Sequence, residues 1–189
     1  MTTQPRCRAV WRTTATGAVI IAAAALWHNL PAPSDVYRPF DVGATLGEQV
    51  SGRVFDLTVT GVRVGRQAQS PRRPPIPALG EWVLVDAELR ATSEFVLPRA
   101  ELLVGPNTYA PSDRFQFVQL GAELAPLITQ HGSWAFDVAP DQLTSSSLLT
   151  LRVWSGDSRF DSRSVVKIPL RDAVRETAPL TVQPARESA

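Results

Sequence analysis

The chain has very little of the residue types that usually hold metals, disulfides and cofactors. Its 189 residues include one cysteine, Cys7, and two histidines, His28 and His131. A single cysteine excludes an intramolecular disulfide, and so few cysteines and histidines exclude the usual zinc sites. Phosphate-binding glycine loops and dinucleotide-binding motifs are absent too. We therefore expect a protein without a metal or a cofactor.

The chain also lacks the excess of positive charge that marks nucleic-acid-binding proteins. Its formal net charge is +1, and three of its basic residues, Arg6, Arg8 and Arg12, precede every acidic residue. The rest of the chain therefore carries two more acidic than basic residues, and we expect no nucleic-acid partner. Only Lys167 is a lysine. This preference for arginine suggests a bacterium with a GC-rich genome.

Long apolar runs are absent, with one exception near the N-terminus. Residues 13–30, TTATGAVIIAAAALWHNL, carry no charge and would span about 27 Å as a helix, slightly less than the roughly 30 Å core of a bilayer. Trp11 and Trp27 bracket the run at a spacing suited to two membrane interfaces, with Arg12 at its inner end. The sequence predicts a transmembrane signal-anchor helix over 13–30, a cytoplasmic tail over 1–12, and export of everything that follows.

A cleavable secretory signal is the alternative interpretation of this segment. A basic start, an apolar centre and small residues such as Ala23, Ala24 and Ala25 also describe signal peptides. Both interpretations export the rest of the chain. A buried helix of a cytosolic protein is less consistent with the preceding arginines and with the prolines at 31 and 33.

The exported part has the pattern of an all-β protein. Residues 31–48 contain three prolines and predict an extracytoplasmic stalk. Alternating apolar and polar residues then predict strands near 50–65, 81–92, 100–104, 131–138, 148–154 and 162–170, with 114–120 undecided between strand and loop. A proline-rich loop is expected over 67–79. No amphipathic helix intervenes, so residues 49–171 predict an antiparallel sandwich of two sheets, followed by a largely disordered tail over 172–189.

The order of these segments resembles a known family. VFDLTVTGVRV, a proline-rich loop, GEWVLVDAELRATSEFVL, AELLVGPNTYAPSD, HGSWAFDVAPDQL, LLTLRVW and RSVVKIPL look like the immunoglobulin-like extracytoplasmic domains of bacterial lipoproteins and membrane-anchored envelope proteins, most of them uncharacterised. The resemblance implies an immunoglobulin-like fold and no established activity. Relatives often have a Pro-Gly turn where this chain has Thr129-Gln130-His131-Gly132, and no functional residue is carried over.

Hydrolytic chemistry has few candidate residues in the exported part. His131 is the only histidine after the apolar run, and a catalytic triad would have to combine it with Ser133 and with Asp137 or Asp141. No nucleophile elbow accompanies these residues. We therefore interpret His131 as a surface histidine and expect no enzymatic activity.

Two pairs of carboxylates are candidates for a glycosidase site and for a calcium site. Asp86 and Glu88 share one face of a predicted strand, about 6.6 Å apart along it, a separation that glycosidases use. The neighbouring Arg90 favours an ordinary solvated face. Asp157 and Asp161 in GDSRFD supply too few oxygens for calcium, which takes about six to eight.

Outward-facing tryptophans are the strongest indication of function. Alternation predicts that Trp134 is in the core, whereas Trp82, Leu84, Leu148 and Trp154 lie on the outward faces of two strands. Clustered outward aromatics mark contact surfaces. In the alternative, the stalk or the proline-rich loop covers them.

Together these features predict a single-pass membrane-anchored envelope protein with its N-terminus in the cytoplasm. Its sandwich would act as a non-catalytic accessory or scaffold subunit for another membrane or cell-wall protein. The alternative is a cleaved, secreted sandwich that binds a lipid or another apolar envelope ligand.

Overall fold

The computed structural model describes residues 5–29, 40–71, 73–115, 117, 119–144, 146–156 and 162–188, with side chains described from Thr16 onward. The chain divides into two units, 1–38 and 39–189. The first unit contains one helix, α1 (Pro5–Asn29), followed by residues 30–39, which lie outside the described part. The predicted interface residues Trp11 and Arg12 belong to this helix, but their side chains are not among those described; Trp27 is exposed.

The helix differs from the predicted transmembrane span over 13–30. Among the described residues, no helix combines the length and the apolar character needed to cross a membrane. The helix begins at Pro5 and therefore includes the three arginines, while Thr13 to Gly17 at one end and His28 and Asn29 at the other are polar or small. The transmembrane part of the fold prediction is thus not supported.

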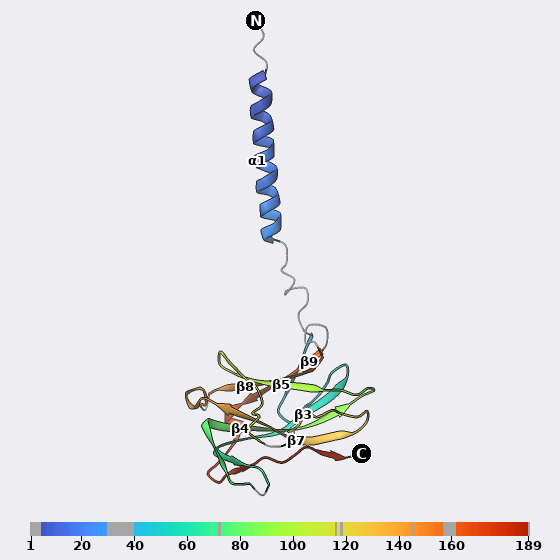
Figure 1. Ribbon diagram of the computed structural model, residues 1–189, viewed down its shortest axis with the longest axis vertical. Coiled ribbons are helices and arrows are strands. Elements are labelled where there is room, and N and C mark those ends of the chain that lie inside the picture. The colour runs from blue at the N-terminus through green and yellow to red at the C-terminus, as the bar shows by residue number, and fades with distance from the viewer. Residues whose placement is uncertain are drawn as a thin grey trace. The chain divides into compact units, whose positions relative to one another are not determined.

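The second unit is a sandwich of two β-sheets, which confirms the all-β prediction (Figure 1). The first sheet has the order β1-β9-β8-β5-β6, and the second has the order β10-β3-β4-β7-β12, with β2 and β11 also paired to β3. The strand bounds are β1 Phe40–Thr45, β2 Gln49–Ser51, β3 Phe55–Gln69, β4 Ile76–Ala91, β5 Pro98–Val104, β6 Asn107–Tyr109, β7 Thr129–Val138, β8 Leu148–Ser155, β9 Ser162–Pro169, β10 Val174–Glu176, β11 Leu180–Thr181 and β12 Arg186–Ser188. Single 3-10 turns lie at Pro140–Gln142 and Leu170–Asp172.

The sequence predicts an antiparallel sandwich, but three strand pairs in the structure are parallel. β1 runs parallel to β9, and β10 and β11 run parallel to β3. Because β1 begins at Phe40, residues 40–48 belong to the sandwich and not to a stalk. The remainder of the predicted stalk, 31–39, lies outside the described residues.

Alternation in the long hairpin β3–β4 places the main core between the sheets. Leu57 and Val59 of β3 are buried, and so are Val62 and Val64. The step of three between Val59 and Val62 would normally turn the second pair outward, but a register shift between Val59 and Gly61 restores their inward direction. A β-bulge at Gly61 thus keeps both pairs of residues directed into the core.

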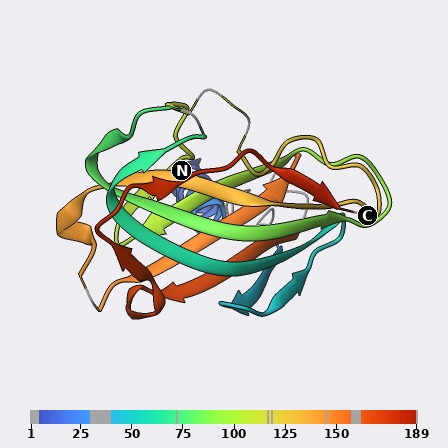
Figure 2. The same cartoon turned by 90° about the horizontal axis from the view of Figure 1, so that it is seen from below.

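A second apolar cluster covers the outer face of the second sheet. It contains Ala68, Trp82, Leu84, Phe115, Ala135, Leu180 and Val182. Much of the cover comes from residues 174–188, here called the C-terminal segment, which pairs with β3 through β10 and β11 and with β7 through β12. It lies across the outer side of the sheet (Figure 2). The prediction of a largely disordered tail over 172–189 is therefore wrong.

The proline-rich loop is shorter than predicted. β3 continues to Gln69 and β4 already begins at Ile76, with Ala68 paired to Ile76 and Gln67 paired to Pro77. Pro77 lies within the strand next to a second register shift, the setting in which a strand tolerates proline. In the undecided segment 114–120, the described residues form no strand.

Candidate functional site

Two of the four predicted contact residues are not at the surface. Trp82 and Leu84 of β4 are fully buried. The Trp82 ring lies 5.2 Å from the Phe115 ring, its Nε1 donates a hydrogen bond of 3.0 Å to the Ile76 carbonyl oxygen, and the Arg114 guanidinium lies over it at 5.2 Å. The prediction that Trp82 and Leu84 form a contact face is therefore wrong, because the outer side of this sheet carries a core of its own.

The other two predicted residues are accessible but far apart. Leu148 begins β8 and is 48% exposed, whereas Trp154 lies near the end of the same strand and is partly exposed. Six residues of strand separate them by about 20 Å. Leu148 and Trp154 therefore do not form one surface, and only Trp154 borders a hollow.

The hollow beside Trp154 has a volume of about 460 Å³ and is built from both sheets and a loop. β5 and β8 of the first sheet provide Arg99 and Trp154, which are cross-strand neighbours. The loop before β7 provides Asp113, Phe115 and Phe117. The lining therefore combines aromatic side chains with two opposite charges, which suits an apolar group carried by a ligand that also has polar groups.

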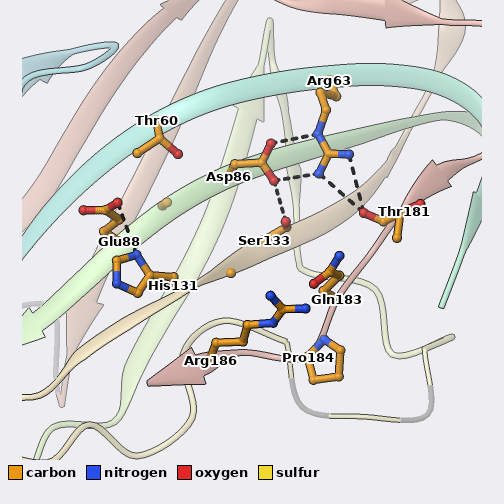
Figure 3. Close-up of a pocket in the computed structure, with 12 residues that line it drawn as sticks. Thr60, Arg63, Asp86, Glu88, His131, Ser133, Thr181, Gln183, Pro184 and Arg186 are labelled. Atoms are coloured by element: carbon orange, nitrogen blue, oxygen red, sulfur yellow. Dashed lines mark hydrogen bonds and ion pairs between the residues drawn. The ribbon is translucent and has the colours of Figure 1, made fainter. Parts of the chain in front are cut away.

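A second, polar groove of about 380 Å³ lies between the C-terminal segment and the outer faces of β3, β4 and β7 (Figure 3). Asp86 is its best-connected residue. It accepts two hydrogen bonds of 2.8 Å from the Arg63 guanidinium and one from the Ser133 hydroxyl. These hydrogen bonds raise the pKa of Arg63, against the opposing effect of its partial burial. Asp86 therefore acts as a structural link between three strands.

Glu88 is held separately from Asp86, so the two carboxylates do not share a site. The Glu88 Oε1 atom lies 3.2 Å from His131 Nδ1. The other ring nitrogen, His131 Nε2, lies 2.9 Å from the Ser188 hydroxyl. The strand register explains both contacts. Glu88 lies opposite His131 in the pairing of β4 with β7 (Figure 3), and β12, which carries Ser188, pairs with the other side of β7.

The serine and carboxylate that contact His131 are not the ones considered from the sequence. Ser133 is hydrogen-bonded to Asp86. Asp137 accepts hydrogen bonds from the backbone N–H groups of Leu79 and Gly80, and Asp141 accepts one from its neighbour Gln142. Sequence reasoning missed Ser188 because it was assigned to a disordered tail.

Metal ligands are not grouped in the described part of the chain. No three histidine, cysteine, aspartate or glutamate residues there are placed to hold a metal ion. Asp157 and Asp161, considered above for calcium, lie outside the described residues.

Comparisons with known proteins find similar solved structures but no family. No family model matches the chain, and no curated protein matches it. Similar solved structures include an uncharacterised β-sandwich protein from Clostridium difficile 630, 14% identical, with 69% of this chain and 95% of that chain covered and a TM-score of 0.47. Another is a candidate lipoprotein from Bacillus subtilis subsp. subtilis str. 168, which is 14% identical, with 66% of this chain and 39% of that chain covered and a TM-score of 0.48. A third is a conserved hypothetical protein from Bacillus anthracis, also 14% identical, with 63% of this chain and 93% of that chain covered and a TM-score of 0.43. The chain is a β-sandwich protein, and no family model supports the finer immunoglobulin-like resemblance.

Proposed function

We propose that this chain is an exported, membrane-associated protein whose sandwich binds a partner protein and performs no catalysis. Export is supported by the three arginines that precede the uncharged residues 13–30. The finer interpretation as an immunoglobulin-like accessory domain of the cell envelope belongs to the same proposal.

The observation that carries the binding role is the aromatic hollow beside Trp154. Its volume of about 460 Å³ falls in the range of roughly 300–1,000 Å³ typical of binding pockets. Tryptophan and arginine are the residues most often found at energetic centres of protein interfaces, and Trp154 and Arg99 lie side by side here. A partner would insert one large apolar side chain onto Phe117 and Trp154, with Arg99 and Asp113 orienting polar groups at the rim.

The experiment is crosslinking in native membranes followed by mass spectrometry of the recovered proteins. It compares the unchanged chain with Trp154→Ala and with Leu148→Ala, a matched change of an accessible residue at the far end of the same strand. We expect one membrane complex to be recovered with the unchanged chain and Leu148→Ala and to be lost with Trp154→Ala. Equal recovery with all three would refute the role of the hollow.

The state of the N-terminal segment is tested in the same cells. Recovery of an intact chain with the membranes supports retention. A mature N-terminus near Leu26 in the soluble exported fraction would instead support the secreted alternative. The hollow would then be searched for a bound lipid by native mass spectrometry.

A second candidate function is the hydrolysis of an ester, and it rests on one observation. Glu88, His131 and Ser188 are linked in the order carboxylate, Nδ1, Nε2 and hydroxyl, which is the order of a catalytic triad. In such a reaction, Ser188 Oγ would attack the ester carbonyl and pass its proton to His131. The imidazolium would return that proton to the leaving alkoxide, and water would then release the acid by the same route.

The cross-strand register accounts for these contacts without any catalytic role, since all three residues sit on one exposed sheet face. A fluorophosphonate probe, which reacts with activated serines, separates the two explanations. Labelling that disappears in Ser188→Ala and persists in Ser133→Ala would establish the hydrolase. Absence of labelling in the intact chain would exclude this candidate.

A further inference from the structure

One end of the sandwich carries four exposed, large apolar side chains. They are Phe40, Phe95, Leu97 and Leu127, each between 58% and 75% exposed. Pairing places them at the same end. Phe40 is opposite Ser162 at the start of β9, and Leu97 directly precedes β5, whose first residue is opposite Ser155, the last of β8.

The second sheet contributes to the same end. The N–H of Leu127 donates a hydrogen bond of 3.0 Å to the carbonyl of Ala91, the last residue of β4, and Phe95 follows four residues later in the chain. The two sheets meet there through the N–H of Arg53, which donates to the Ser162 hydroxyl at 2.8 Å. The four side chains therefore project from separate strand ends and loops, and they line neither the aromatic hollow nor the polar groove.

Leu127 is held in a backbone conformation that favours glycine. Its φ is 64°, and it is the one non-glycine residue with positive φ in the described part of the chain. A leucine at this position is strained, and its side chain is 63% exposed, so packing within the sandwich does not compensate for the strain. The position and exposure of this side chain point to a contact outside the fold.

We propose that this end of the sandwich inserts its four apolar side chains into the surface of a phospholipid bilayer. The proposal rests on the membrane association of the proposed function, and it names the lipid surface as the second partner. Single apolar side chains at separate loop tips suit the interfacial region of a bilayer, which accepts them without a complementary pocket. A protein partner would more typically use a concave, packed centre such as the hollow beside Trp154.

The length of the intervening chain agrees with a lipid surface as the occupant. Phe40 follows the uncharged residues 13–29 after residues 30–39, and ten residues span at most about 35 Å. Membrane association of the first segment would therefore keep this end of the sandwich within reach of the same surface. Exposed Arg53, Arg90 and Arg99 with Glu94 give this end a small positive charge, so attraction to anionic lipids would add to the apolar insertion.

The experiment uses the full chain in a Cys7→Ser background with one new cysteine that carries an environment-sensitive dye. Leu97→Cys places the dye at the proposed lipid-facing end, and Leu148→Cys places it at the opposite end of the sandwich as a matched control. Vesicles of phosphatidylcholine and phosphatidylglycerol are added, and vesicle binding is measured in parallel by sedimentation. We expect dye fluorescence at 97 to rise by about twofold or more and to shift to the blue on entering an apolar environment, with no change at 148.

Further changes connect the signal to the four side chains. Phe95→Ser combined with Leu127→Asn should reduce the rise at 97 by about half or more without lowering the melting temperature, because both side chains are mostly exposed and asparagine tolerates the left-handed backbone at 127 better than leucine does. If the chain sediments with vesicles but the fluorescence of the dye at 97 does not change, insertion of this end is refuted and membrane association stands. If the chain does not bind vesicles at all, insertion of this end and membrane association are both refuted. Equal responses at 97 and 148, or a response at 97 that requires membrane proteins, would also overturn the proposal.

Discussion

Replacing Trp82 with alanine should destabilise the sandwich strongly, because this side chain joins the C-terminal segment to the second sheet. Trp82 is fully buried beside Phe115, in the apolar cluster that also contains Leu180 of the C-terminal segment. Truncating a buried tryptophan costs about 3–5 kcal/mol. The Ile76 carbonyl also loses its partner, which adds roughly 1 kcal/mol. We therefore expect a loss of about 4–6 kcal/mol in the free energy of unfolding.

The assay is thermal and urea unfolding of the full chain, followed by circular dichroism and tryptophan fluorescence. For a domain of this size each kcal/mol lowers the melting temperature by about 2–4 °C, so Trp82→Ala should lower it by roughly 8–24 °C. Trp154→Ala is the matched control. Its partly exposed side chain should cost about 1–2 kcal/mol, since less apolar area leaves solvent on folding.

The comparison separates the two tryptophans by role. Equal losses of stability in the two variants, within about 1 kcal/mol, would contradict the second apolar cluster as a source of stability. A stable Trp82→Ala protein that loses its membrane partner would restore the original contact-face prediction for Trp82.

Three further predictions concern the backbone and the polar groove. Asp86→Ala should lower the free energy of unfolding by about 1–3 kcal/mol in urea unfolding, because the half-buried Arg63 loses its carboxylate partner. Because the pKa of Arg63 is raised, its contribution to the free energy of unfolding is complete below the strongly alkaline range and is lost only as pH rises through that range. If the stability lost in Asp86→Ala changed between pH 6 and 9, the Arg63–Asp86 pairing would be contradicted. Leu127→Gly should raise stability by about 0.5–1 kcal/mol, as relief of left-handed strain exceeds the entropy cost of glycine, and a fall would argue against the strain. Gly80→Ala should lower the melting temperature sharply, since a Cβ there would meet the Val138 carbonyl oxygen, and an unchanged melting temperature would disprove the close approach.

The sequence predicts the main core well because the evidence for it is local. Alternation along β3, β4 and β8 identifies inward residues such as Leu57, Leu89 and Leu151, and all three are fully buried. The glycine-associated bulge in β3 is likewise a local signal. In these strands each residue's environment is set by its position relative to its immediate neighbours.

The outer face of the second sheet was mispredicted because its cover comes from far along the chain. Trp82 to Val85 form a continuous apolar run, a pattern typical of a strand buried on both faces, and that pattern was the available signal. Leu180 and Val182 are apolar residues two positions apart in a proline-containing segment, but two such residues are too few to predict a strand. The Glu88–His131–Ser188 contacts depend on the same long-range pairing, so no local pattern indicates them.

The late cover of Trp82 has a consequence for how the protein is made. The ribosome must add about a hundred residues after Trp82 before Leu180 can pack against it, which takes roughly 5–20 s at ordinary rates of synthesis. During that time the outer face of the hairpin β3–β4 displays Trp82 and Leu84 to the surroundings. A chain that is exported before its C-terminal segment has docked would cross the membrane without a completed second cluster. The order of the sequence therefore delays completion of the second apolar cluster until late in synthesis.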